Sequence, residues 1–259
     1  MQNYTDMFNL TGNIALVTGG TSGLGYAIAE AFLQNGADVA VCGGHPEKAD
    51  ALQEIATKYN RRFLALSCDV TDSTQVNAMV ETIGQTLGPI SLLVNSAGIN
   101  KRIAAEDYDD ASFQRVMDVN VNGTHFVTRA VGKQMMIPAR HGHIINISSV
   151  KGVIGTTQDY IGYCTSKGAV NMYTKQLACE WGKHGITCNA IAPTFVRTPI
   201  NTAQLDDVDF YNTLCKRIPL QHIGQEKDIA AAAVFLCSEG AAFISGQILG
   251  VDGGLTAMQ

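Results

Sequence analysis

Short apolar segments alternate with longer amphipathic segments along almost the whole chain of 259 residues. The short segments are rich in β-branched residues, and most are continuously apolar, as strands buried on both faces of a sheet are. They predict strands at residues 14–20, 38–43, 63–70, 91–98, 143–149, 186–193 and 247–252.

The segments between these strands have helical period. Apolar residues recur on one helical face at Val76, Val80, Ile83 and Leu87, and on another at Ala49, Leu52, Ala56 and Tyr59. Helix start signals occur at Pro46, at Asp72 with Ser73, and at Asp109 with Asp110. Two helices, at about 109–134 and 160–184, are expected to be unusually long.

About six strand–helix repeats without a linker predict one α/β domain over residues 1–259, with helices on both faces of a doubly wound parallel sheet. A closed eight-strand barrel uses the same alternation. The glycine-rich first turn favours the open sheet, whose ligand site lies beyond the carboxyl ends of the strands. Residues 194–209 lack a clear period and contain Pro199, so we expect a substrate lid at about 194–217.

Composition narrows the class of protein. The chain is 46% hydrophobic and 16% charged, and 18 basic against 23 acidic residues give a net charge of −5. No basic stripe indicates a nucleic-acid partner. No apolar run approaches the about 20 residues that span a bilayer, and the N-terminal segment lacks the features of a signal peptide. We therefore expect a cytoplasmic protein that acts without a membrane or a nucleic acid.

The seven cysteines form an odd set and never occur as CxxC. Most lie inside apolar segments. We interpret them as reduced thiols of the core rather than as a disulfide framework or a metal site, and no metal is expected.

A glycine-rich turn follows the first predicted strand. Glycines let the backbone approach a pyrophosphate, and a helix N-terminus offers free N–H groups and the positive end of the helix dipole. A tight turn that binds nothing is the alternative. The strand–turn–helix context favours a dinucleotide site, formed by Gly19, Thr21, Ser22, Gly23, Leu24 and Gly25.

Tyr163 and Lys167 lie one helical turn apart, on a face that continues through Val170 and Thr174 toward the core. A phenol titrates near pH 10 in water, and a cation within a few ångströms lowers its pKa. We therefore expect Lys167 to make Tyr163 a usable general acid and base. A buried Tyr–Lys pair with a purely structural role is the alternative.

Ser149 ends a predicted strand at the edge where an open sheet binds ligands, so its hydroxyl could bind a substrate oxygen. Ser148 is a rival on sequence alone, because adjacent strand residues face opposite sides. Asn120 lies in an apolar helical stripe, where its amide must be satisfied, and a backbone hydrogen bond at a helix distortion would do so.

Together these motifs resemble the short-chain dehydrogenase/reductase family. The spacing TGxxxGxG, the sequence Asn95-Ser96-Ala97-Gly98, the YxxxK pair and the serine fourteen residues before the tyrosine follow one another in the family's order. The resemblance implies a seven-stranded Rossmann sheet ordered 3-2-1-4-5-6-7, about three helices on each face, a nicotinamide cofactor and a homotetramer.

The resemblance also implies roles for single residues. It selects Ser149 over Ser148, makes Tyr163 catalytic, lets Lys167 bind the nicotinamide ribose, and gives Asn120 a water that links Lys167 to solvent. Asp69 would contact the adenine, with a helix N-cap as its alternative. The other implied cofactor contacts are Val70, Asn95, Ala97, Gly98, Pro193, Val196 and Thr198. This chain has Thr194 where the family has a glycine after the proline.

The end of the second strand decides between NAD and NADP. An acidic residue there binds the ribose hydroxyls of NAD, whereas an arginine there or in the glycine loop pairs with the phosphate of NADP. This chain has neither, with Gly44 and His45 as the expected contacts. The missing arginine favours NAD, although His45 and Lys48 could still hold a phosphate.

Polar loops surround the expected reaction centre and favour a small polyhydroxylated substrate. The strings NSAGINKR and VDGGLTAMQ resemble the sugar-acid and polyol branch of the family. We expect NAD(P)-dependent interconversion of a secondary hydroxyl and a ketone. Arg102 is expected to bind a carboxylate of the substrate, and a solvated loop arginine is the alternative. Two alternatives stay open: a 3-oxoacyl carrier-protein reductase, with Arg140 and His184 as a basic patch, and a non-catalytic cofactor-sensing protein.

Overall fold

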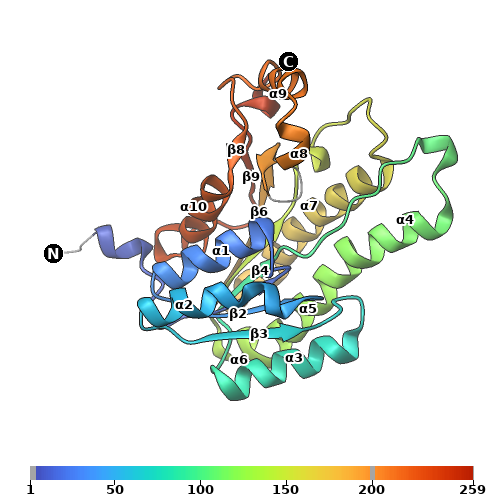
Figure 1. Cartoon of the computed structure of the whole chain (residues 1–259). Helices are drawn as coiled ribbons and strands as arrows, with labels where there is room; N and C mark the ends of the chain where they lie inside the picture. The colour runs from blue at the N-terminus through green and yellow to red at the C-terminus, as the bar shows by residue number, and fades with distance from the viewer. Residues whose placement is uncertain (1–3, 199–201, 259) are drawn as a thin grey trace.

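A computed structural model describes residues 4–198 and 202–258. Its main element is a sheet of seven parallel strands in the order β3-β2-β1-β4-β5-β6-β9 (Figure 1). The predicted order is confirmed, and the closed barrel is excluded. The strands are β1 (Ile14–Thr18), β2 (Asp38–Gly43), β3 (Phe63–Ser67), β4 (Leu92–Asn95), β5 (Gly142–Ile147), β6 (Ile186–Pro193) and β9 (Ile248–Val251).

Helices cover both faces of the sheet (Figure 1). Alternate residues of β1 point to opposite faces of the sheet, and each face carries a buried apolar cluster. Ala15 and Val17 pack into the first cluster, and Leu16 packs into the second. The first cluster is covered by α1 (Gly23–Gln34), α2 (Asp50–Lys58) and α10 (Glu226–Leu236). The second is covered by α3 (Ser73–Thr86), α5 (Gly123–Val131) and α7 (Ile161–Trp181).

Helix boundaries follow the predicted start signals. Asp72 accepts a hydrogen bond from the Thr74 amide at 2.8 Å, and Asp109 accepts one from the Ser112 amide at 2.8 Å. The predicted apolar face of α3 is buried. Tyr59 does not belong to the buried face of α2, because it follows the last turn as the C-cap and is 40% exposed.

The long helix predicted at about 109–134 is a continuous helical path with two π-helical turns. It runs through α4 (Asp110–Met117), η4 (Asp118–Asn122), α5, η5 (Gly132–Met136) and α6 (Ile137–Ala139). The path ends at Arg140, whose φ is +54°.

The predicted lid is more regular than its sequence pattern indicated. It contains β7 (Val196–Arg197), α8 (Thr202–Leu205) and α9 (Val208–Cys215), and β7 pairs with β8 (Gly224–Gln225). Pro199 lies outside the described residues. The lid shares a small apolar cluster with the segment that follows it, made of Leu205, Leu214, Cys215, Ile218 and Ile223. Because these short elements bury their apolar residues against one another, no long period appears in the sequence.

The remaining elements are 3-10 helices in the connections. They are η1 (Tyr4–Phe8), η2 (Pro46–Ala49), η3 (Ala105–Asp107), η6 (Val150–Gly152), η7 (Gly182–His184), η8 (Glu239–Ala241) and η9 (Leu255–Ala257). Among the described residues, no helix is both long enough and apolar enough to cross a membrane. Five of the seven cysteines are buried free thiols, whereas Cys164 is half-buried and Cys179 exposed.

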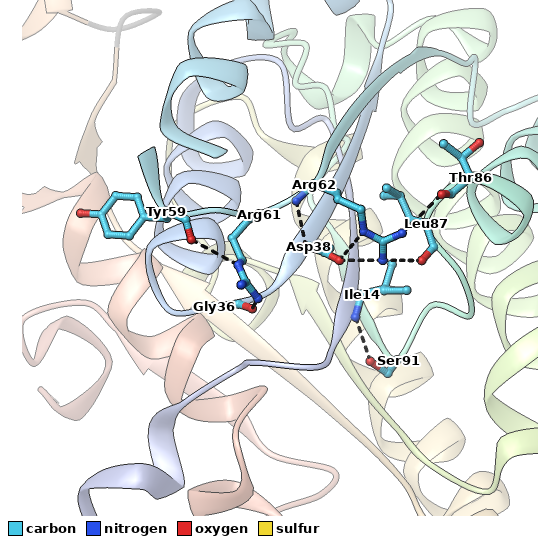
Figure 2. Close-up of polar contacts among 9 residues, drawn as sticks. All are labelled: Ile14, Gly36, Asp38, Tyr59, Arg61, Arg62, Thr86, Leu87 and Ser91. Carbon is cyan, nitrogen blue, oxygen red and sulfur yellow. Dashed lines mark hydrogen bonds and ion pairs between the residues drawn. The ribbon is translucent and has the colours of Figure 1, made fainter. Parts of the chain in front are cut away.

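The amino edge of the sheet is held by an arginine clamp (Figure 2). Arg62 donates from Nε to Asp38 Oδ2 at 2.7 Å, and its Nη2 reaches the Leu87 carbonyl oxygen at 2.7 Å. The clamp therefore connects β2, the start of β3 and the C-terminal end of α3. It lies at the opposite edge of the sheet from the strand ends that form the candidate site.

Candidate active site

The turn between β1 and α1 brings several backbone segments close together. Gly19 has a φ of +64°, and a Cβ built on it would lie 2.9 Å from the Ala97 backbone. Gly23 has a φ of +53° and faces open space. Ser22 is the N-cap of α1, but its side chain makes no capping hydrogen bond, so the first backbone N–H groups of the helix point toward the opening.

These segments border a cleft of about 670 Å³ at the carboxyl edge of the sheet. Twelve of the predicted site residues line it: Gly19, Ser22, Gly23, Leu24, Gly25, Ala97, Gly98, Ser149, Tyr163, Lys167, Pro193 and Thr198. Six further wall residues were not among the predicted site residues: Ser96, Ile99, Asn100, Ile147, Ser148 and Thr194. Their position follows from contiguity with predicted residues, which is the signal that could have found them.

Other predicted residues do not line this cleft. They are Thr21, Gly44, His45, Asp69, Val70, Arg102, Asn120, Val196 and, discussed below, Asn95. Val70 and Val196 are buried apolar side chains. Asp69 accepts hydrogen bonds from the Thr71 amide at 2.9 Å and the Thr71 hydroxyl at 2.8 Å. The N-cap of α3 is Asp72, so the N-cap alternative for Asp69 is wrong.

Asn95 connects strands rather than facing the cleft. Its Nδ2 donates to Thr128 Oγ1 and to Asn146 Oδ1, each at 2.9 Å, and the residue is 3% exposed. Its Oδ1 is buried without a hydrogen-bond partner among the described residues. The side-chain amide therefore joins β4 to β5 and α5, and the expected cofactor contact of Asn95 stays a prediction.

Ser148 and Ser149 differ in the hydrogen-bond partners of their hydroxyl groups. Ser148 Oγ donates to Asn171 Oδ1 at 2.6 Å, inside the molecule. Ser149 Oγ lies 3.5 Å from the Pro193 carbonyl oxygen and accepts from the Lys151 amide at 3.1 Å, and the Ser149 hydroxyl acts to lower the pKa of the Tyr163 phenol. Both serines line the cleft, but Ser149 is the one whose hydroxyl group interacts with the tyrosine.

Lys167 is buried behind Tyr163. Its Nζ donates to the Ile147 carbonyl oxygen at 2.7 Å and lies 5.6 Å from the centre of the Tyr163 ring. Burial lowers the pKa of Lys167 to about 8. Burial also raises the pKa of Tyr163 to about 12, against the lowering effect of the Ser149 hydrogen bond. The expected net lowering of the phenol pKa by Lys167 is therefore wrong for the protein alone, since desolvation outweighs the other effects.

Asn120 lies in the π-helical turn η4, which is the helix distortion that its sequence context predicted. Its Oδ1 accepts from the Ile99 amide at 2.8 Å, and its Nδ2 donates to the Ile99 carbonyl at 2.9 Å and to Ser166 Oγ at 2.9 Å. A Cβ built on Gly98 would lie 3.3 Å from Asn120 Oδ1 and 3.6 Å from Lys167 Nζ. Asn120 and Lys167 therefore approach Gly98 together.

Sequence similarity to known proteins identifies the family of this chain. The profile of a family described as enoyl-(acyl carrier protein) reductase matches residues 19–256. The chain is 37% identical to gluconate 5-dehydrogenase of Gluconobacter oxydans, over 98% of both chains. The chain belongs to the short-chain dehydrogenase/reductase family.

Other members of the family extend the comparison. Galactitol 2-dehydrogenase (L-tagatose-forming) of Cereibacter sphaeroides is 37% identical, over 98% of both chains. The crystal structure of a gluconate 5-dehydrogenase from Burkholderia cenocepacia, in complex with NADP and tartrate, superposes with a TM-score of 0.93 at 35% identity. That match covers 99% of this chain and 100% of the other. As a short-chain dehydrogenase/reductase, this protein is an enzyme that uses a nicotinamide cofactor.

The residues present fit such a cofactor. The open space at Gly23, the uncapped N-terminus of α1 and the cleft that continues to Tyr163 and Lys167 form one connected surface. Of the alternatives, the carrier-protein reductase is not favoured by the named relatives. Its basic patch is also weak, because Arg140 Nη2 is used to bind the Lys183 carbonyl at 2.9 Å.

Proposed function

We propose that this enzyme interconverts a secondary hydroxyl and a ketone on a small sugar acid or polyol. The convergence of Ser149, Tyr163 and Lys167 on the cleft that begins at the glycine turn carries the proposal. The sugar-acid and polyol names of the relatives support the substrate class. The cofactor supplies the chemistry that these side chains lack, by accepting or donating a hydride at its nicotinamide ring.

Tyr163 is the proposed acid and base, because its phenol is the titratable hydroxyl nearest to Ser149 in the cleft. In oxidation the phenolate takes the proton of the substrate hydroxyl, and in reduction the phenol returns it. Ser149 Oγ fixes the same substrate oxygen. Lys167 binds the nicotinamide ribose, and Asn120 holds a water that carries protons between Lys167 and solvent.

The dinucleotide would be held along the carboxyl ends of β1, β2, β3 and β4. Gly19, the turn through Gly25, Ala97 and Gly98 would face its pyrophosphate and nicotinamide ends. Gly44, His45, Asp69 and Val70 would face the adenosine, and Pro193, Val196 and Thr198 the carboxamide. The lid at about 194–217, which includes α8 and α9, would close over the substrate.

We propose that NAD is used and that NADP is not strongly preferred. No arginine occupies position 22, 43 or 44, and His45 Nδ1 lies 3.0 Å from Glu47 Oε1. A carboxylate beside His45 opposes binding of a second phosphate there. The bound NADP of the Burkholderia relative is the reason to measure both cofactors.

A homotetramer is the proposed assembly. The edge strand β9 leaves Leu249 36% exposed, and Phe243 in the preceding loop is fully exposed. Met172 on α7 is 64% exposed. Such apolar side chains on an edge strand and on a long helix are typical of surfaces covered by other subunits. Light scattering at micromolar concentration tests this assembly, and a monomer would contradict it.

The central experiment is an activity panel. Sugar acids, polyols and acyl thioesters are assayed with NAD and with NADP, following the absorbance of the reduced cofactor. Turnover of sugar acids or polyols, with Tyr163→Phe reduced about 10²–10⁴-fold while cofactor binding is retained, is the expected result. Near-normal turnover by Tyr163→Phe, or activity on acyl thioesters alone, would overturn the proposal.

A further inference from the structure

A group of basic side chains surrounds Tyr160, next to the catalytic tyrosine. Arg102 Cζ lies 5.1 Å from the centre of the Tyr160 ring, and Lys151 Nζ lies 5.2 Å from it. The Tyr160 ring is itself 6.2 Å from the Tyr163 ring. Two cations therefore share one aromatic side chain at the substrate end of the site.

Arg217 adds a third positive charge from the lid. It lines a small pocket together with Lys151 and Thr194, and Thr194 also lines the main cleft. Burial lowers the pKa of Lys151, and the charges of Arg217 and Arg102 add to this effect. The basic cluster of Arg102, Lys151 and Arg217 thus combines the loop after β4, the turn η6 and the segment after α9.

No carboxylate compensates this cluster among the residues that the structure describes. The ion pairs between described residues involve other side chains, such as Lys101 with Asp109 at 3.9 Å and Arg197 with Asp206 at 3.1 Å. Gathering like charges is unfavourable unless an anion joins them. In a chain with a net charge of −5, this concentration of uncompensated positive charge is a local feature of the substrate end.

We propose that the basic cluster binds the carboxylate of the substrate, so that the enzyme prefers sugar acids to neutral polyols. This inference rests on the proposed function, and it decides between its two substrate classes. Lys151 and Arg217 are the new specificity residues, and Tyr160 holds Lys151 and Arg102 in place. The Lys151 amide also donates to Ser149 Oγ, so one short turn would position both the carboxylate and the reacting oxygen.

The test compares two six-carbon substrates, D-gluconate and galactitol, in initial-rate assays of the full-length enzyme. Lys151→Gln and Arg217→Gln should each raise the KM for gluconate by about tenfold or more, because each removes a charge-assisted hydrogen bond. The KM for galactitol and the kcat for both substrates should change less than about threefold. The charge-conserving variants Lys151→Arg and Arg217→Lys should retain most of the preference for the acid. They control for an effect of substitution at these positions on folding.

Neighbouring cations provide matched controls. Lys101→Gln changes the residue next to Arg102, but Lys101 is paired with Ser112 and Asp109. Lys216→Gln changes the exposed residue next to Arg217. Both controls should leave the ratio of the two KM values unchanged.

Three outcomes would overturn the carboxylate site. They are turnover of galactitol with no better use of gluconate, equal effects of the glutamine variants on both substrates, and better use of a galactitol phosphate ester than of gluconate. Each leaves the proposed oxidoreductase intact, because the polyol is still oxidised and Tyr163→Phe still abolishes that reaction. Failure of the proposed function itself would appear differently, as no turnover of either substrate with either cofactor.

Discussion

Ser148 and Ser149 are adjacent in the chain, yet their hydroxyl groups belong to different parts of the molecule. Ser148 Oγ donates to Asn171 Oδ1 at 2.6 Å and ties the end of β5 to α7. Ser149 Oγ faces Tyr163 in the cleft. A backbone that is still extended at Ser149, with φ −165° and ψ 157°, gives the two side chains these opposite directions.

This relationship predicts a split between activity and stability. Ser149→Ala should lower kcat by about 10²-fold or more with little change in Tm, because it removes a group that holds the substrate oxygen. Ser148→Ala should retain most of the activity and lose about 1–2 kcal/mol of unfolding free energy, since it leaves a buried amide oxygen without its donor. Steady-state kinetics and thermal unfolding of both variants measure the split, and the reverse pattern would reassign the serine.

The pH dependence of the two reaction directions should differ. Oxidation needs the phenolate of Tyr163, whose pKa burial raises to about 12. The phenolate fraction therefore grows with pH, and kcat for oxidation should rise between pH 7 and 10, by up to about tenfold per unit. Reduction needs the phenol, which stays protonated over this range, so its kcat should change little. Equal pH profiles in both directions at saturating cofactor would contradict Tyr163 as the proton donor and acceptor.

Sequence patterns predicted the parts of the molecule that local rules control. The alternation of strands and helices, the helix N-caps at Asp72 and Asp109, and the glycine turn depend on apolar periodicity, capping and backbone freedom, which short segments of sequence contain. The strand order does not follow from such local rules, and it was predicted from the family resemblance. Predicted strands often extended past the observed ends, as at residues 148 and 149, where the backbone of Ser149 is still extended although β5 ends at Ile147.

Other features depend on tertiary contacts and could not be predicted. The use of Asn95 depends on Thr128 and Asn146, which approach it from other elements. The sign of the Tyr163 pKa shift depends on how deeply the phenol is buried, which the YxxxK spacing does not specify. The basic cluster joins three segments whose sequences show no common motif, so only the fold brings Lys151 and Arg217 together.

Cofactor preference should respond to Glu47. A hydrogen bond from its own backbone amide is the main cause that lowers the Glu47 pKa, so this carboxylate is charged at neutral pH beside His45. Glu47→Gln should raise kcat/KM for NADP relative to NAD severalfold, because it removes a negative charge near the expected position of the second phosphate. Glu54→Gln, on the exposed side of α2, is the matched control. A wild-type enzyme with a large preference for NADP would overturn the lean to NAD.

The arginine clamp at the amino edge should affect stability alone. Arg62→Ala removes bonds to Asp38, to Leu87 and, at 3.5 Å, to the Thr86 carbonyl oxygen (Figure 2). Because the side chain is about half exposed, we expect a loss of only about 1–2 kcal/mol of unfolding free energy. Arg61→Ala, which removes the guanidinium bonds to the Tyr59 and Gly36 carbonyl oxygens, should cost less. Unchanged kcat and KM in both variants would show that the clamp does not act on the site.

Lys167 should lower the unfolding free energy of the protein, although the reaction requires this residue. Its pKa is about 8 in the fold and 10.5 in the unfolded chain, so the unfolded chain binds the proton more tightly between these values. The cost of the buried charge is therefore fully present below pH 8 and disappears as pH rises to 10.5. Lys167→Met lacks this cost, since a methionine of similar length fills the same space without a charge.

Lys167→Met should accordingly be inactive and weakened in cofactor binding, yet unfold at a higher temperature than the wild type at pH 7. The difference in Tm between the two proteins should shrink steadily from pH 8 to 10.5. Other groups that titrate in this range, including the buried cysteines and Tyr163, are common to both proteins and largely cancel in the difference. Lys167→Gln, which retains a hydrogen-bond donor for the Ile147 carbonyl, separates the lost charge from the lost hydrogen bond. If the Tm difference were independent of pH, Lys167 would have the same pKa in the folded and in the unfolded chain, and the buried ammonium group would not be the source of the cost.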